Sequence, residues 1–302
     1  MAEDSRMLTP PGELINVEGR KVHIQRSGTG SPTVVFESGL LSDSFAFAKV
    51  QPEIAKFTST ISYDRAGMGY SEPSSNPERV RSVLAKELFE LLDILALSEP
   101  VVLIGWSAGG QYIRDFAYDH PERVAGMVLI DSPIANDLEF FPDDIAQIIQ
   151  QNRNNTTDLY SRFSKMNKKE ILDEFGNNPP WQYRHPDTHK YYEDTVSPDL
   201  FKYFFQILSS WRKELKEGSK LIKSLGEIPL TVIYAVEESS SDFTEEQNEQ
   251  SNKIWADLQR DLSELSTNSR LIEVVSGHDI ANEKPEILID AIVDIVNQVR
   301  SA

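Results

Sequence analysis

The sequence predicts an α/β protein with a mostly parallel sheet of eight strands and helices on both faces. Short apolar runs rich in β-branched residues, such as 33–36, 101–104 and 127–130, have the composition of buried strands. Between them lie segments such as 80–97, in which apolar residues recur at helical spacing. Strands that alternate with helices in this way build parallel sheets covered on both sides.

The first part of the chain is predicted to be strand-rich. Residues 13–17 and 21–26 alternate in polarity around Glu18-Gly19-Arg20, which indicates a β-hairpin. Strands follow at 33–36 and 59–63, and each one ends in a glycine-containing turn. We therefore expect an antiparallel start to the sheet and a parallel continuation.

The second half of the sheet is predicted from three further apolar runs. These are 127–130, 230–234 and 270–275, each short enough to be a single buried strand. A last amphipathic helix begins at Pro285, since proline is favoured in the first turn of a helix.

Residues 134–225 interrupt this alternation. They contain short helical patterns, many charges and many aromatic side chains. We interpret them as a helical lid inserted after the sixth strand, with 1–133 and 226–302 forming the core domain. The lid aromatics either line an apolar pocket or make a core for the lid itself; they are Phe140, Phe141, Trp181, Tyr183, Tyr191, Tyr192, Tyr203, Phe204, Phe205 and Trp211.

The composition narrows the classes of partner. The net charge of −18 would repel phosphates, so nucleic acids and anionic membranes are not expected partners. The absence of cysteine excludes disulfides, thiolate metal sites and cysteine nucleophiles. No apolar run has the length of a membrane span, and the first residues lack the apolar core of a signal peptide. We expect a cytoplasmic soluble protein.

The pentapeptide Gly105-Trp106-Ser107-Ala108-Gly109 directly follows the apolar run 101–104 and precedes a helical pattern. A G-x-S-x-G sequence between a buried strand and a helix is typical of the nucleophile elbow, a sharp turn that exposes a serine hydroxyl. Ser107 is therefore the predicted nucleophile.

A serine needs a base to accept its proton, and His278 is the predicted base. It follows the strand 270–275, and sites in open α/β sheets gather at the carboxyl ends of strands. The other histidines fit this role less well. His23 lies within an early strand and His120 ends a helix, whereas His185 and His189 lie in the lid, where their spacing is a weak metal-binding signal.

The acid that orients the imidazole has two candidates. Asp131 ends the strand 127–130, and Glu238 follows the strand 230–234. The tract after Glu238 is acidic and rich in serine, and a poorly held carboxylate orients histidine badly. Asp131 is therefore preferred, with Glu238 as the alternative.

An acyl-transfer reaction also needs backbone N–H groups directed at the developing oxyanion. Ala108, directly after the nucleophile, supplies one of them. The second is expected in the turn after the strand 33–36, where Gly39 lets the chain turn and Leu40 is the predicted donor.

A further glycine-rich segment, 64–69, has too short a G-x-G and no clear helix after it for a phosphate site. We predict a structural turn there, with Asp64 and Arg65 pairing or capping locally.

Taken together, these motifs resemble the α/β-hydrolase fold superfamily, in which nucleophile, acid and base follow one another in this chain order. The resemblance implies a serine esterase-like hydrolase with a Ser-His-acid catalytic triad and an oxyanion hole. The resemblance implies action on an ester, lactone, thioester or amide of a small molecule, or on a carbon–carbon bond, without metal or organic cofactor. Family members often carry His-Gly where Ser38-Gly39 stands here. Dehalogenases and epoxide hydrolases of the family place aspartate where Ser107 stands. The alternative function is a hydrolase-fold ligand receptor with slow or single turnover, because the same triad serves both.

Overall fold

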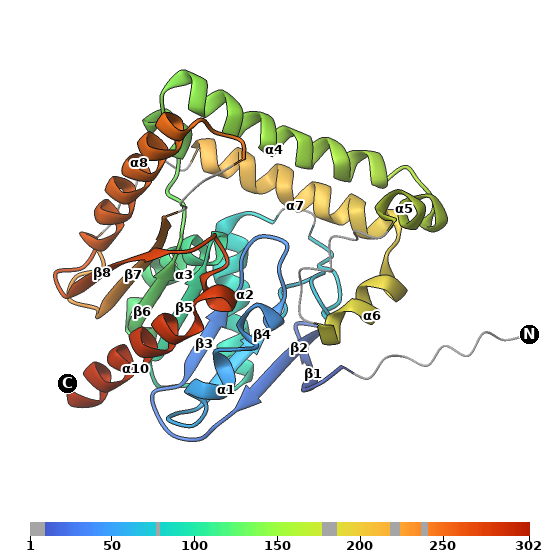
Figure 1. Cartoon of the computed structure of the whole chain (residues 1–302). Helices are drawn as coiled ribbons and strands as arrows, with labels where there is room; N and C mark the ends of the chain where they lie inside the picture. The colour runs from blue at the N-terminus through green and yellow to red at the C-terminus, as the bar shows by residue number, and fades with distance from the viewer. Residues whose placement is uncertain (1–9, 77–78, 177–185, 218–223, 237–240) are drawn as a thin grey trace, which may run out of the picture.

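The computed structural model describes residues 10–76, 79–176, 186–217, 224–236 and 241–302. Its centre is an eight-stranded sheet with the strand order β1-β2-β4-β3-β5-β6-β7-β8 (Figure 1). The pairs β1–β2 and β2–β4 are antiparallel, and all later neighbours are parallel. This confirms the predicted fold class. The strands are β1 (Glu13–Val17), β2 (Arg20–Ser27), β3 (Val34–Glu37), β4 (Thr60–Tyr63), β5 (Val101–Trp106), β6 (Val124–Ile130), β7 (Leu230–Val236) and β8 (Ser269–Val275).

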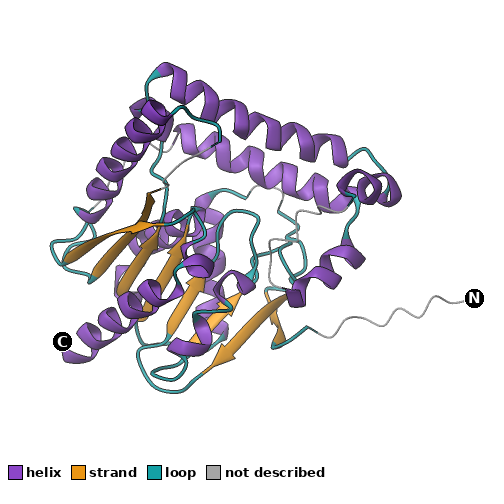
Figure 2. Ribbon diagram, in the orientation of Figure 1, coloured by secondary structure: helices purple, strands orange, loops and turns teal. Residues whose placement is uncertain are grey.

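Helices cover both faces of the sheet (Figure 2). Those that pack on it or at its ends are α1 (Gln51–Ile54), α2 (Arg81–Ile94), α3 (Ala108–Asp119), α8 (Glu245–Ser263), α9 (Ile280–Glu283) and α10 (Pro285–Ser301). Alternate side chains of β5 point to opposite faces. Leu103 packs with residues of α2, α3 and α8, whereas Val102 and Ile104 pack with residues of α1 and α10. The two layers of the core therefore follow from the period of two along a buried strand.

Two element boundaries differ from the sequence prediction for physical reasons. The helix predicted to reach Leu97 ends at Ile94, because Ala96 adopts a left-handed φ of 54° that a helix cannot contain. The strand predicted from residue 127 begins at Val124. It includes Gly126, where a Cβ would lie 2.6 Å from Ile295 on α10, so close helix packing explains a glycine in a buried strand.

The chain between β6 and β7 forms its own group of helices. They are α4 (Asp143–Phe163), α5 (Lys168–Phe175), α6 (Pro186–Thr195) and α7 (Pro198–Glu217), preceded by the short η3 (Asp137–Phe140). Figure 1 shows α4 and α7 running side by side across one edge of the sheet. Aromatic residues of this region, among them Phe163, Phe201 and Phe204, pack on one another in a separate apolar cluster. Of the aromatics predicted to belong to a lid, Tyr191, Tyr192, Tyr203 and Phe204 join this cluster, which also includes Leu41 and Met68 from outside that region. Trp181 and Tyr183 lie outside the described residues.

Helix α8 has a well-defined start. Thr244 accepts a hydrogen bond from the N–H of Gln247, and the Gln247 side chain accepts one from the N–H of Thr244. Such a capping box contributes on the order of 1 kcal/mol and fixes where the helix begins. Within the described part of the chain, none of the helices combines the length and apolar character needed to cross a membrane.

Candidate active site

Ser107 occupies the junction between β5 and α3 in a strained backbone conformation, with φ 53° and ψ −126°. Such a conformation costs about 1–3 kcal/mol in a residue other than glycine and persists only where the surroundings impose it. The glycines on either side make the turn possible. A Cβ at Gly105 would lie 2.7 Å from the backbone of Gly110, and one at Gly109 would lie 2.6 Å from the carbonyl oxygen of Ser38. The predicted elbow geometry is thus present.

His278 and Asp131, 147 residues apart in the chain, meet at the ends of β8 and β6. The imidazole Nδ1 lies 2.5 Å from Asp131 Oδ2. Oδ1 of the same carboxylate accepts hydrogen bonds from the Ala235 N–H at 3.0 Å and from Trp255 Nε1 at 2.7 Å. Asp131 is buried, whereas the His278 side chain is half exposed. The carboxylate is therefore fixed by three donors, and it fixes the ring in turn.

Glu238, the alternative acid, lies in the segment 237–240, outside the described residues. The structure thus gives the geometry of Asp131 but does not describe that of Glu238.

Ser107, Asp131 and His278 all line one cavity of about 410 Å³ beneath α4 and α7. This volume lies within the range of about 300–1,000 Å³ typical of small-molecule sites. The wall combines apolar and polar side chains drawn from the sheet edge, α4, α7 and α8. The remaining lining residues are Pro133, Asp137, Phe141, Ile149, Arg153, Trp211, Ala235, Phe243, Asn248, Ser251, Asn252 and Trp255.

The turn after β3 lies directly against the elbow. A Cβ at Gly39 would lie 3.3 Å from Cβ of Ser107 and 3.1 Å from the ring of Trp106, so glycine allows the close approach. Leu40 follows in that turn, and Ala108 is the fully buried first residue of α3. Both predicted oxyanion donors are therefore close to Ser107 in the fold.

Trp106 has a contact that the sequence did not indicate. Its Nε1 donates to the carbonyl oxygen of His278 at 2.9 Å, and the two rings lie 5.4 Å apart. This hydrogen bond thus links the elbow to the loop that carries His278. No local sequence signal reveals a contact between residues 172 positions apart.

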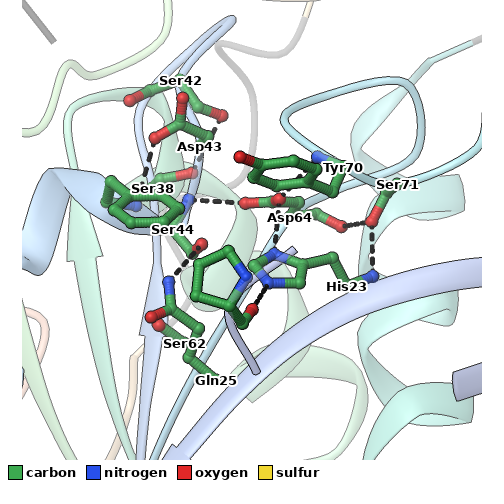
Figure 3. A network of polar contacts seen from close by, with 12 residues as sticks. His23, Gln25, Ser38, Ser42, Asp43, Ser44, Ser62, Asp64, Tyr70 and Ser71 are labelled. Atoms are coloured by element: carbon green, nitrogen blue, oxygen red, sulfur yellow. Dashed lines mark hydrogen bonds and ion pairs between the residues drawn. The ribbon is translucent and has the colours of Figure 1, made fainter. Parts of the chain in front are cut away.

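The remaining histidines lie elsewhere. His23 is fully buried in β2, and its Nδ1 lies 2.7 Å from Asp64 Oδ2 (Figure 3). His120 packs on the rings of Phe89 and Phe116 at the end of α3. His185 and the side chain of His189 fall outside the described residues. In the part of the chain that is described, no three His, Asp or Glu side chains are grouped to hold a metal ion.

The segment 64–69 is a structural turn, but one of its predicted contacts is wrong. Asp64 accepts hydrogen bonds from the N–H groups of Tyr70 at 2.9 Å and Ser44 at 2.7 Å (Figure 3). Arg65 does not pair locally; it reaches Glu37, 28 residues earlier. The sequence could not reveal this pairing, because it depends on β3 lying beside β4 in the sheet.

The sequence matches a known protein family over about two thirds of its length. The family profile described as the alpha/beta hydrolase fold matches residues 32–235. The chain belongs to this family. The uncharacterized protein YqjL of Bacillus subtilis (strain 168) is 24% identical over 281 residues, which cover 92% of this chain and 89% of that protein. A 2-hydroxymuconate semialdehyde hydrolase of Pseudomonas sp. (strain CF600) is 34% identical over 123 residues, or 40% of this chain and 43% of the relative.

Solved structures show the same fold over nearly the whole chain. Epoxide hydrolase CorEH has a TM-score of 0.70 at 21% identity and covers 95% of this chain and 98% of its own. A thermophilic esterase from Thermogutta terrifontis has a TM-score of 0.64 at 18% identity, with coverages of 95% and 97%. At these identities the structural likeness establishes the fold. The family match places the protein in a superfamily of hydrolases.

Proposed function

We propose that this protein is a serine hydrolase that cleaves a small-molecule ester, lactone, thioester or amide through an acyl enzyme at Ser107. One observation carries the proposal: a strained serine at the end of β5 shares a cavity with His278, whose Nδ1 is bonded to the buried Asp131. In this proposal, residues 134–225 are a lid over a core of 1–133 and 226–302.

The reaction follows from the donors and acceptors. A carboxylate only accepts hydrogen bonds, so Asp131 holds the Nδ1–H tautomer of His278 and leaves a lone pair on Nε2. Nε2 accepts the Ser107 proton as the hydroxyl oxygen attacks the substrate carbonyl carbon. The N–H groups of Leu40 and Ala108 stabilise the oxyanion. Nε2–H then protonates the leaving group, and a water molecule, deprotonated in the same way, releases the acid and regenerates Ser107.

A serine nucleophile favours carbonyl chemistry over the reactions of the dehalogenase and epoxide hydrolase branches. A hydroxyl that attacks an alkyl carbon forms an ether, which offers no carbonyl carbon to a second water molecule. An aspartate forms an ester in the same reaction, and water can hydrolyse that ester. Ser107 therefore turns over only substrates that leave it acylated.

The cavity wall supports a partly apolar substrate. Phe141, Ile149 and Trp211 line it from the lid side. Asn248 and Ser251 also line it; they stand three positions apart on α8 and thus share one helix face. A substrate with an apolar body and at least one hydrogen-bonding group fits this division. From the cysteine-free composition we further propose a cytoplasmic location.

The test combines active-site labelling with turnover. A fluorophosphonate should label the wild-type protein at Ser107, and p-nitrophenyl esters of increasing acyl length should be hydrolysed. Ser107→Ala should abolish both, with a loss of about 10⁴–10⁶ in kcat. Activity that survives in Ser107→Ala would refute the assignment. One stoichiometric acylation without turnover would instead favour the receptor function.

A further inference from the structure

A buried ion pair lies beneath the turn that carries Leu40. Arg65 Nη1 donates to Glu37 Oε1 at 2.5 Å, and the Tyr63 hydroxyl donates to the other oxygen of that carboxylate. The guanidinium carbon also lies 5.2 Å from the ring centre of Tyr112. Arg65 and Glu37 are 7% and 2% exposed. Because Glu37 binds the edge of the planar guanidinium and Tyr112 packs on its face, Arg65 has little freedom to move.

The same guanidinium also binds the backbone of the turn. Nη1 donates to the carbonyl oxygen of Ser38 at 2.6 Å, and Nη2 donates to that of Gly39. The Gly39 carbonyl and the Leu40 N–H belong to one trans peptide unit, so they point in opposite directions. Fixing the Gly39 oxygen on Arg65 therefore directs the Leu40 N–H away from Arg65.

The turn needs such a hold because its backbone is strained. The Ser42 N–H donates to the Gly39 oxygen at 3.1 Å, which closes a turn around Leu41, whose φ is 56°. A left-handed conformation is unfavourable for leucine and stays in place only under outside constraint. Asp64 fixes the far end of the turn through the Ser44 N–H (Figure 3). The two consecutive residues that follow β4 thus secure the turn at both ends.

We propose that Arg65 is the positioning residue of the oxyanion hole: seated on Glu37, it binds the Gly39 carbonyl and thereby directs the Leu40 N–H at the developing oxyanion. This inference rests on the proposed acyl transfer at Ser107. It also accounts for Ser38-Gly39 standing where His-Gly is common, because the Arg65–Glu37 pair fixes the turn from below.

Two requirements shape the experiment. Arg65→Met alone would strand the Glu37 carboxylate in the interior, which is strongly destabilising. The double variant Arg65→Met/Glu37→Gln removes both charges, while the amide oxygen introduced at position 37 can still accept from the Tyr63 hydroxyl. Arg79→Met is the matched control. Arg79 is also buried, at 2% exposed, and its partner Glu87 keeps Arg20 at 3.2 Å.

The measurements are kcat and KM for a p-nitrophenyl ester, Tm, and the inhibition constant of a trifluoromethyl ketone, which forms a tetrahedral adduct with serine. Removing one oxyanion donor costs about 10²–10³ in kcat, so we expect a loss of about 10² in the double variant. KM should change less than about threefold, because ground-state binding does not use the hole. The inhibition constant should rise by the same factor as kcat falls.

Arg65→Lys keeps a cation beside Glu37 but not the planar pair of donors, so it should recover Tm more fully than kcat. It also serves as the test if the double variant does not fold. Wild-type kcat and inhibitor affinity in both Arg65 variants, or a loss of kcat that the inhibitor does not share, would overturn the proposal. If the wild-type protein shows no Ser107-dependent hydrolysis, the proposed function itself fails. If that hydrolysis is present but does not depend on Arg65 as stated, only the inference about Arg65 fails.

Discussion

Replacing Asp131 by asparagine tests the centre of the proposed mechanism. The change is isosteric, and the structure fixes which way the new amide faces. Ala235 N–H and Trp255 Nε1 both donate to Oδ1, so the amide oxygen must occupy that position. The amide NH₂ then faces His278 Nδ1, 2.5 Å from the former Oδ2. Because this NH₂ can only donate, Nδ1 must become the acceptor and the ring proton moves to Nε2.

A ring protonated at Nε2 cannot accept the Ser107 proton. In Ser-His-Asp enzymes this tautomer error costs about 10⁴ in kcat, equivalent to about 5 kcal/mol in the activation free energy. Stability should fall by only about 1 kcal/mol, because both hydrogen bonds to Oδ1 survive in neutral form.

The assay is initial-rate hydrolysis of a p-nitrophenyl ester, with the rate of fluorophosphonate labelling as an independent measure of nucleophilicity. Tm serves as the control for folding. Glu238→Gln is the matched variant, and it should leave kcat within about twofold of wild type. A loss below about tenfold in Asp131→Asn, together with a larger loss in Glu238→Gln, would refute the reasoning and transfer the role to Glu238.

Four further predictions concern the site, the residues that support it and the buried histidine of β2. Trp255→Phe removes a 2.7 Å donor from the site carboxylate, worth about 1.5–3 kcal/mol, so kcat/KM should fall about 10–10²-fold; an unchanged value would contradict the role of this bond. Gly110→Ala places a Cβ 2.6 Å from Ser132 Cβ, and this overpacking should cost about 1–3 kcal/mol in urea unfolding, against no change if the contact relaxes freely. For wild type, kcat/KM should rise between roughly pH 5 and pH 8, because only the neutral imidazole of the site is a base; a flat profile would exclude it. Burial lowers the pKa of His23, but the hydrogen bond and charge of Asp64 outweigh burial and leave that pKa raised. A raised pKa stabilises the fold below the unfolded value and ceases to do so as the pH passes the folded one. The unfolding free-energy gap between wild type and His23→Gln should therefore shrink as the pH rises above the ordinary histidine pKa of 6.5, and a constant gap would show that the pair does not titrate.

The order of strands and helices could be predicted because its signals are local. A buried strand such as 101–104 shows itself in its own composition, and the glycines around Ser107 reflect backbone crowding within a few residues along the chain. His278 could be predicted as the base because it alone among the histidines follows a strand near the end of the sheet pattern.

The supports of the site were not predictable in the same way. Trp255 reaches Asp131 across 124 positions, and Trp106 reaches His278 across 172. Arg65 meets Glu37 only because β4 lies beside β3 in parallel register. Nothing in the local pattern around these residues distinguishes them from ordinary core or turn positions.

The sequence by itself determined the eight-stranded α/β architecture, the elbow that holds Ser107, and the chain order of the predicted nucleophile, acid and base, because periodicity and turn chemistry act between near neighbours. Only the tertiary structure decided that Asp131 is bonded to His278 and that Arg65 grips the turn of Leu40. These contacts depend on which strands lie side by side and in what register, and the pairing of strands brings together side chains that the chain keeps far apart.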